Sequence, residues 1–263
     1  IGSRLSAALA AWFAATNYVY VMYGRVALLE AAMVSLVVAS WACYAAARRR
    51  PALGAAAGIL AMAAFFTKAS AAFFLAGIGI DCCWSLARWV SARRRGPMGA
   101  ADADAGREAA AALYTVAGLA AAGFAALTLF VVPNLDEYLF YNVRLYGERR
   151  SASGIGVIVD RASWLPIIHD FFTRMLVLTW VSVAGFVVAM FTWHRKPMGE
   201  RLLWLWLALG AAELILHDTG NERRFVFLIP AMAGLTALVL ARDFRLLPEG
   251  AGRLSLRRIW WAA

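Results

Sequence analysis

The chain has 263 residues, of which 63% are hydrophobic and 16% are charged, and its formal net charge is +10. Soluble domains average about 45–50% apolar and about 25% charged residues, and one soluble core of this size cannot bury so many apolar side chains. The composition therefore excludes an ordinary soluble domain. It predicts an all-α fold, a polytopic bundle of transmembrane helices.

The positive charge lies in short blocks between the apolar runs. The blocks are Arg48–Arg50, Arg93–Arg95, Arg195–Lys196, and Arg253 with Arg257–Arg258. Such blocks are typical of the positive-inside rule, by which arginine and lysine mark the cytoplasmic loops of membrane proteins. The net charge therefore favours a membrane topology, and we expect no nucleic-acid partner.

Apolar runs of roughly 20 residues predict about eight transmembrane spans. The runs cover about 5–22, 28–47, 52–66, 69–88, 111–132, a stretch within 164–193, 202–216 and 225–241. The chain begins at Ile1 and shows no secretory signal. We therefore expect residues 1–263 to be the transmembrane domain of a longer protein, present here as an N-terminally truncated fragment.

The run from Ala52 to Val90 is too long for one crossing. As a single helix it would measure roughly 58 Å at a rise of 1.5 Å per residue, against a hydrocarbon core about 30 Å thick. Two short spans that turn at Thr67–Lys68 would keep the arginine triplets at 48–50 and 93–95 on one side. We predict this arrangement, with both triplets in the cytoplasm.

Two polar segments separate the spans. Residues 96–110 are small and polar and predict a cytoplasmic linker. Residues 133–163 predict an amphipathic helix and a loop on the outer face, because apolar residues recur there at helical spacing. Asn134 and Glu137 have the spacing of a capping box at the start of that helix.

Ionisable residues gather at the outer ends of the predicted spans. Arg25 and Glu30 border the second span, and Lys68 lies at the turn. A charge within the bilayer costs about 2.5–3.5 kcal/mol on the insertion scale, so such residues are candidates for function. Arg25 and Glu30 either line a site or reach to water as an interfacial pair. Lys68 either binds a lipid phosphate or anchors the turn at the interface.

The segment HDTGNERR, residues 217–224, joins the last two predicted spans on the outer side. Its candidates for substrate binding are His217, Glu222, Arg223 and Arg224. We expect the arginine pair to precede a helix N-terminus, where free N–H groups, the helix dipole and guanidinium groups together favour a bound anion. The alternative is a simple ion pair between Glu222 and an arginine.

Three segments in this order resemble the membrane glycosyltransferases of GT-C type. They are YGRVALLEAAMVSLVVA, LGAAAGILAMAAFFTKAS and NERRFVFLIPAMAGL. The nearest subgroup is similar to the protein O-mannosyltransferases and aminoarabinose transferases. The resemblance implies a GT-C-like fold in a bacterial inner membrane, a polyprenyl-phosphate sugar donor, and a glycan, lipid or protein acceptor on the outer face, with inversion at the anomeric carbon.

The resemblance also implies where the catalytic base lies. In the family an acidic residue of the first large outer loop activates the acceptor, and that loop precedes the segment that resembles residues 5–30. We therefore expect the base upstream of residue 1, and no residue of this chain is predicted to be catalytic. Arg223, Arg224 and Lys68 would neutralise the departing phosphate. The sequence requires no cofactor and has no recognisable metal motif, although some relatives use a divalent metal.

Two other functions are compatible with the outer charges. A transporter or flippase of a lipid-linked sugar would show internal repeats and charges at mid-membrane depth, whereas here the sequence shows no repeat and the charges lie at span ends. A purely structural membrane subunit would tolerate alanine at the outer charges.

Overall fold

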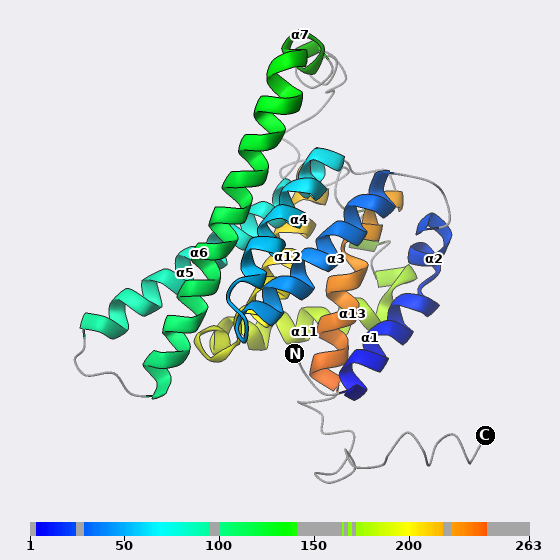
Figure 1. Cartoon of the computed structure of the whole chain (residues 1–263). Helices are drawn as coiled ribbons and strands as arrows, with labels where there is room; N and C mark the ends of the chain where they lie inside the picture. Colours follow the sequence, from blue (N-terminus) through cyan, green and yellow to red (C-terminus); the bar gives the residue numbers. More distant parts are fainter. Residues whose placement is uncertain are drawn as a thin grey trace, which may run out of the picture.

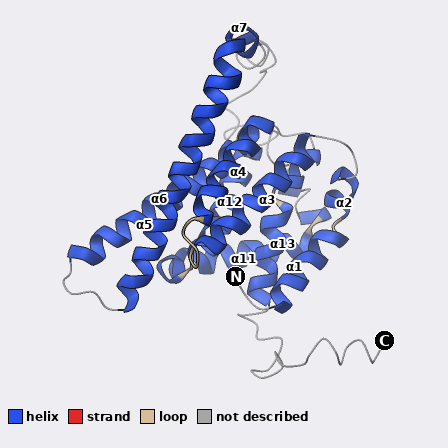
Figure 2. Ribbon diagram, viewed as in Figure 1, coloured by secondary structure: helices blue, strands red, loops and turns tan. Residues whose placement is uncertain are grey.

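The computed structural model describes residues 4–24, 29–94, 100–140, 165, 168–169, 172–217 and 222–240. Every regular element within these residues is helical, and none is a β-strand (Figure 2). The all-α prediction is therefore confirmed for the described part of the chain.

The elements follow one another as a helical bundle (Figure 1). In chain order they are α1 (Arg4–Thr16), α2 (Tyr18–Gly24), α3 (Leu29–Ala47), α4 (Leu53–Thr67), η1 (Ala69–Ala71), α5 (Ala72–Arg94), α6 (Ala100–Ala126), the π-helical turn η2 (Leu127–Val131), η3 (Val132–Asn134), α7 (Leu135–Leu139), α11 (Leu176–Thr192), η5 (Trp193–Arg195), α12 (Met198–His217), η6 (Glu222–Phe227) and α13 (Ile229–Leu238).

Three helical stretches of the described residues are long and apolar enough to cross a membrane. They are Leu29–Ala47, Ala69–Arg94 and Ala103–Leu139, and shorter apolar helices cover Leu5–Thr16, Leu53–Thr67, Leu176–Thr192 and Phe225–Leu238. These lengths and compositions are compatible with a membrane protein. The predicted number of about eight spans stays a prediction.

The first predicted span is divided into two helices. α1 ends at Thr16 and α2 begins at Tyr18. The side-chain oxygen of Asn17 accepts a hydrogen bond from the backbone N–H of Tyr20 at 3.0 Å, which is how asparagine caps the start of a new helix. The predicted span over about 5–22 is therefore interrupted at Asn17, where a local side-chain bond competes with the backbone hydrogen bonds of the helix.

The turn at Thr67–Lys68 is confirmed. α4 ends at Thr67, Lys68 has an extended backbone with φ −156° and ψ 123°, and the chain re-enters a helix through η1. Because the backbone leaves the helical region at this residue, the long apolar run becomes two helices.

The segment predicted as a linker is mostly helical. α6 begins at Ala100 and continues without a break to Ala126. Alanine is the strongest helix former, and the carboxylate of Asp104 lies 3.7 Å from the guanidinium of Arg107 one turn further on. These local preferences outweigh the polar composition of 96–110. Its cytoplasmic location stays a prediction.

The next segment prolongs α6 past the rest of the bundle. η2, η3 and α7 follow α6 as one rod, which projects beyond the other helices in Figure 1. Asn134 directly precedes α7, as predicted, but its side chain does not cap the helix. It donates instead to the carbonyl of Phe130 at 2.8 Å. The rest of the predicted outer helix and loop, 141–163, lies outside the described residues.

Glycines bring α4 and α6 into close contact. A Cβ on Gly54 would lie 2.4 Å from the carbonyl oxygen of Ala111, and one on Gly58 would lie 2.2 Å from that of Thr115. On the facing helix, a Cβ on Gly118 would lie 2.2 Å from the backbone oxygen of Ala55. Small residues spaced four apart allow this approach between membrane helices. The contact fixes how α4 is aligned along α6.

Aromatic residues hold η6 and α12 against α5. The indole of Trp206 donates to the carbonyl of Phe227 at 2.8 Å, and the ring of Phe227 stacks on Phe73 with 4.7 Å between centroids. Phe74 meets Trp206 edge to face. The core therefore lies between these helices.

The bundle has two ends that carry charge. We call them the Lys68 end, where α3 begins and α4 ends, and the Arg201 end, where α12 begins.

Candidate functional site

The Lys68 end holds an ion pair between two of the predicted site residues. Glu30 lies in the first turn of α3 and Lys68 follows the last residue of α4. Because α3 and α4 pack against each other along the chain reversal, the ammonium of Lys68 reaches the carboxylate of Glu30 and donates a short hydrogen bond to it. The side chain of Glu30 is only 8% exposed and that of Lys68 is 23% exposed.

This pairing changes the expected role of Lys68. The sequence left two roles open for Lys68, a ligand for a lipid phosphate or an anchor at the interface, and the structure joins its ammonium to a buried carboxylate. An anionic ligand would therefore have to share the ammonium with Glu30. A lysine has three N–H donors and can bond two acceptors at once, so the pair orients Lys68 without using all of its donors.

The other predicted site residues lie partly outside what the structure describes. Arg25 is outside the described residues. His217 is the last residue of α12, and η6 contains Glu222, Arg223 and Arg224, but the described part does not include these four side chains. η6 contacts both α2 and α3. The backbone of the arginine pair therefore belongs to the same end of the bundle as Glu30.

The arginine pair was expected directly before a helix N-terminus, and it does not directly precede α13. The pair lies in the short 3-10 element η6, and the first residue of α13 is Ile229. The free N–H groups at the start of α13 are therefore not next to the arginines. The residues that follow, Phe225 to Leu228, are all at most 4% exposed. They face the protein core, where the ring of Phe227 stacks on Phe73 of α5 and its backbone carbonyl accepts from Trp206 of α12.

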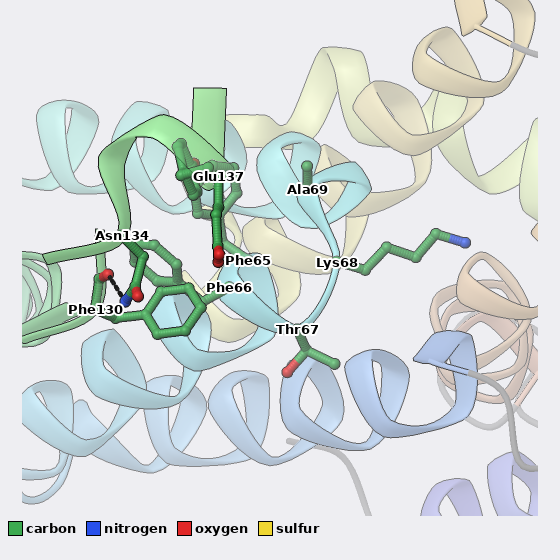
Figure 3. A pocket seen from close by; sticks show the side chains of 9 residues that line it. Phe65, Phe66, Thr67, Lys68, Ala69, Phe130, Asn134 and Glu137 are labelled. Carbon is green, nitrogen blue, oxygen red and sulfur yellow. Dashed lines mark hydrogen bonds between the residues drawn. The ribbon is translucent and has the colours of Figure 1, made fainter. Parts of the chain in front are cut away.

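An open cavity of about 460 Å³ lies beside Lys68. Its walls come from the end of α4, the turn at Lys68, and the rod formed by η2, η3 and α7. The lining residues are Phe65, Phe66, Thr67, Lys68, Ala69, Phe130, Asn134, Glu137 and Tyr138. Figure 3 shows Glu137 reaching from α7 toward Phe65 and Phe66, while the side chain of Lys68 extends away from them. Glu137 was predicted only as a capping residue.

A second charged cluster, at the Arg201 end, was missed by the sequence analysis. The guanidinium of Arg201 pairs with the carboxylate of Asp81, lies 3.1 Å from that of Glu108, and donates to the hydroxyl of Ser85 at 2.9 Å. The side chains of Arg201 and Asp81 are both 0% exposed. Three helices, α5, α6 and α12, therefore meet at one buried arginine.

Neighbouring groups complete this network. The hydroxyl of Tyr44 donates to Asp81 at 2.8 Å, and the guanidinium of Arg88 lies 3.3 Å from the carboxylate of Glu108. Lys196 and Glu200 form a further buried pair at 2.7 Å. A buried charge is tolerated only when it is paired and hydrogen-bonded, and these contacts meet that requirement. We define the Arg201 network as Tyr44, Asp81, Ser85, Arg88, Glu108 and Arg201.

Asp81 lies inside α5, with nine helical residues before it and thirteen after it. An aspartate within an apolar helix must have a partner, so its position was a usable signal. The partner could not be named, because Arg201 is 120 residues away in the sequence.

No group of three or more potential metal ligands occurs among the described residues. Comparison of the chain with protein-family models, with curated proteins and with solved structures finds no match.

Proposed function

We propose that the chain is an integral membrane glycosyltransferase that uses a polyprenyl-phosphate sugar and acts on the outer face of the membrane. In this proposal it is a multi-pass, GT-C-like bundle of about eight spans in a bacterial inner membrane. The Lys68 end would face outward and the Arg201 end would face the cytoplasm, because the arginine blocks at 48–50 and 93–95 are on the latter side.

The observation that supports the proposal best is the Glu30–Lys68 ion pair at the Lys68 end of the bundle. The pair holds a cation at a helix end, at the same end of the bundle as the backbone of Arg223 and Arg224. A lipid-linked phosphosugar presents its phosphate at the level of the headgroups. A cation with remaining N–H donors suits that phosphate.

The proposed reaction leaves the developing charge on the phosphate. The bond between the anomeric carbon and the phosphate oxygen breaks, and the phosphate departs with the electron pair. A bond from the acceptor oxygen to the anomeric carbon forms from the opposite side, and the acceptor proton passes to a base. Lys68 would stabilise the departing phosphate, with Arg223 and Arg224. Glu30 would orient Lys68, and no described residue is assigned as the base.

The buried charges of the Arg201 network bear on the rival proposal, a transporter or flippase. Such a protein would place charges at mid-depth along a substrate path. Tyr44 is one turn from the end of α3 and Arg201 is in the first turn of α12. The network therefore lies near one end of α3 and of α12. Asp81 is in the middle of α5, but its carboxylate is bonded to Arg201 and Tyr44, which favours a structural role.

A binding measurement tests the proposal. The full chain is purified and reconstituted in nanodiscs, and its affinity for polyprenyl phosphate is compared with that for the uncharged polyprenol. We expect polyprenyl phosphate to bind at least tenfold more tightly, and Lys68→Met or the double variant Arg223→Ala/Arg224→Ala to remove most of that difference. Arg50→Ala, an exposed cation near the opposite end, serves as the matched control and should leave it unchanged.

The proposal fails if the two lipids bind equally well to the unmodified protein. It also fails if Arg50→Ala weakens phosphate binding as much as Lys68→Met, since that result would indicate attraction by the overall positive charge rather than a site.

A further inference from the structure

The polar side chains of the cavity beside Lys68 offer hydrogen-bond acceptors. The hydroxyl of Thr67 already donates its hydrogen to the carbonyl of Ala63 at 2.8 Å, so its oxygen is left to accept. The amide nitrogen of Asn134 donates to Phe130, which leaves its carbonyl oxygen available. The ionised carboxylate of Glu137 can only accept.

The ammonium of Lys68 does not point at the carboxylate of Glu137. Lys68 lines the cavity, but its ammonium is bound to Glu30 and extends away from Glu137 in Figure 3. Among the described residues, no ion pair or hydrogen bond is made by the carboxylate of Glu137, which is exposed at the cavity wall. Of the described side chains that line the cavity, the carboxylate of Glu137 is therefore the charged group that has no ion pair.

Aromatic side chains share the cavity with that carboxylate. Phe65, Phe66 and Phe130 line the same cavity, and Phe130 is 59% exposed although it is a large apolar side chain. Aromatic faces attract cations within about 6 Å of the ring centre, and quaternary ammonium groups are recognised in this way. A carboxylate beside several rings therefore favours a ligand with a positive charge and an apolar surface.

We propose that this cavity is a binding site for an organic ammonium group, held by the carboxylate of Glu137 and by the rings of Phe66 and Phe130. Its volume of about 460 Å³ is within the range of small-ligand sites. A primary ammonium would also donate to the oxygens of Thr67 and Asn134. The ammonium can belong to the headgroup of a membrane lipid or to a water-soluble amine. This site does not depend on the proposed sugar donor.

Two measurements on the full chain in phosphatidylglycerol nanodiscs distinguish these sources. The first titrates choline and records saturation transfer to its N-methyl protons. The second adds phosphatidylethanolamine and measures by native mass spectrometry how much stays bound after release from the disc. Each is repeated with Glu137→Gln and with Asp136→Asn. Asp136 is the matched control, because it is an exposed carboxylate of the same helix that does not line the cavity.

We expect Glu137→Gln to weaken binding of at least one probe about tenfold, and Asp136→Asn to change it less than twofold. Loss confined to choline identifies a soluble amine, and loss confined to phosphatidylethanolamine identifies a lipid headgroup. The proposal is overturned if neither probe binds the unmodified protein, if Glu137→Gln binds both as well as before, or if both variants weaken binding equally.

Discussion

The two charged ends of the bundle use the same kinds of side chain in opposite ways. At the Arg201 end, Arg201 and Asp81 are fully buried, and Glu108 is 7% exposed. At the Lys68 end, Lys68 is 23% exposed and forms one ion pair beside an open cavity. The first arrangement uses its charges to join helices to one another. The second keeps polar groups within reach of a ligand.

The comparison of the two ends indicates that a buried charge is not by itself evidence of a functional site. Arg201 and Asp81 are fully buried, and the groups that bond to them come from α3, α5, α6 and α12. The less buried end has the cavity and the carboxylate of Glu137. The proposed ligand sites therefore lie where the bonding is incomplete.

The largest effect is expected at the Arg201 end. Arg201→Met removes the cation of the network and leaves Asp81 and Glu108 buried with fewer partners. Breaking a buried ion pair in this way costs about 3–5 kcal/mol. We expect a loss of this size in the free energy of unfolding, measured by titration with sodium dodecyl sulfate and followed by tryptophan fluorescence.

Arg93→Met, on the exposed side of the same end, should differ little from the unmodified protein. Equal stability of Arg201→Met and Arg93→Met would show that the network does not hold the helices.

A smaller effect is expected between the two ends, where α4 meets α6. Gly58→Ala places a Cβ 2.2 Å from the carbonyl oxygen of Thr115, so the helices must separate. Overpacking of this kind costs about 1–3 kcal/mol. Gly79→Ala is the matched control, because a Cβ there meets nothing within 4 Å, and its better helix propensity adds up to about 1 kcal/mol. Thermal unfolding in detergent should therefore shift in opposite directions for the two variants. If both shift alike, the close contact is not what aligns α4 and α6.

The smallest effect is expected at the Lys68 end. Glu30→Gln removes the carboxylate, but the Lys68 ammonium it leaves behind is partly exposed and can turn to solvent. We expect a loss of only about 1 kcal/mol in the free energy of unfolding. The same surfactant titration checks this value against Arg201→Met. A loss at Glu30 as large as that at Arg201 would remove the distinction between a structural end and an accessible one.

Local patterns explain how much of the fold could be predicted. The helical class follows from long apolar runs, and the reversal at Lys68 follows from the excessive length of residues 52–90. A local hydrogen bond decides the break at Asn17. Helix propensity decides the helix over 100–110. The apolar or polar composition of a segment does not reveal either effect. Both were missed for that reason.

The candidate site was predicted less completely. Glu30 and Lys68 were identified one by one from the cost of charge near the bilayer, but their pairing was not. Glu137 was noted only as a capping residue, because its place in a cavity wall depends on how the rod beyond α6 lies over the end of α4. The Arg201 network was missed because its members come from four separate helices.

The sequence by itself determined that this chain is made of apolar helices, with ionisable residues at particular places along them, since hydropathy and turn chemistry depend on neighbouring residues. Only the tertiary structure decided which charges meet. The contact of Gly54 and Gly58 with α6 aligns α4 along α6, and the packing of α5 against α12 brings Asp81 to a partner 120 residues away. An ion pair requires contact within a few ångströms, and distance along the chain does not specify it.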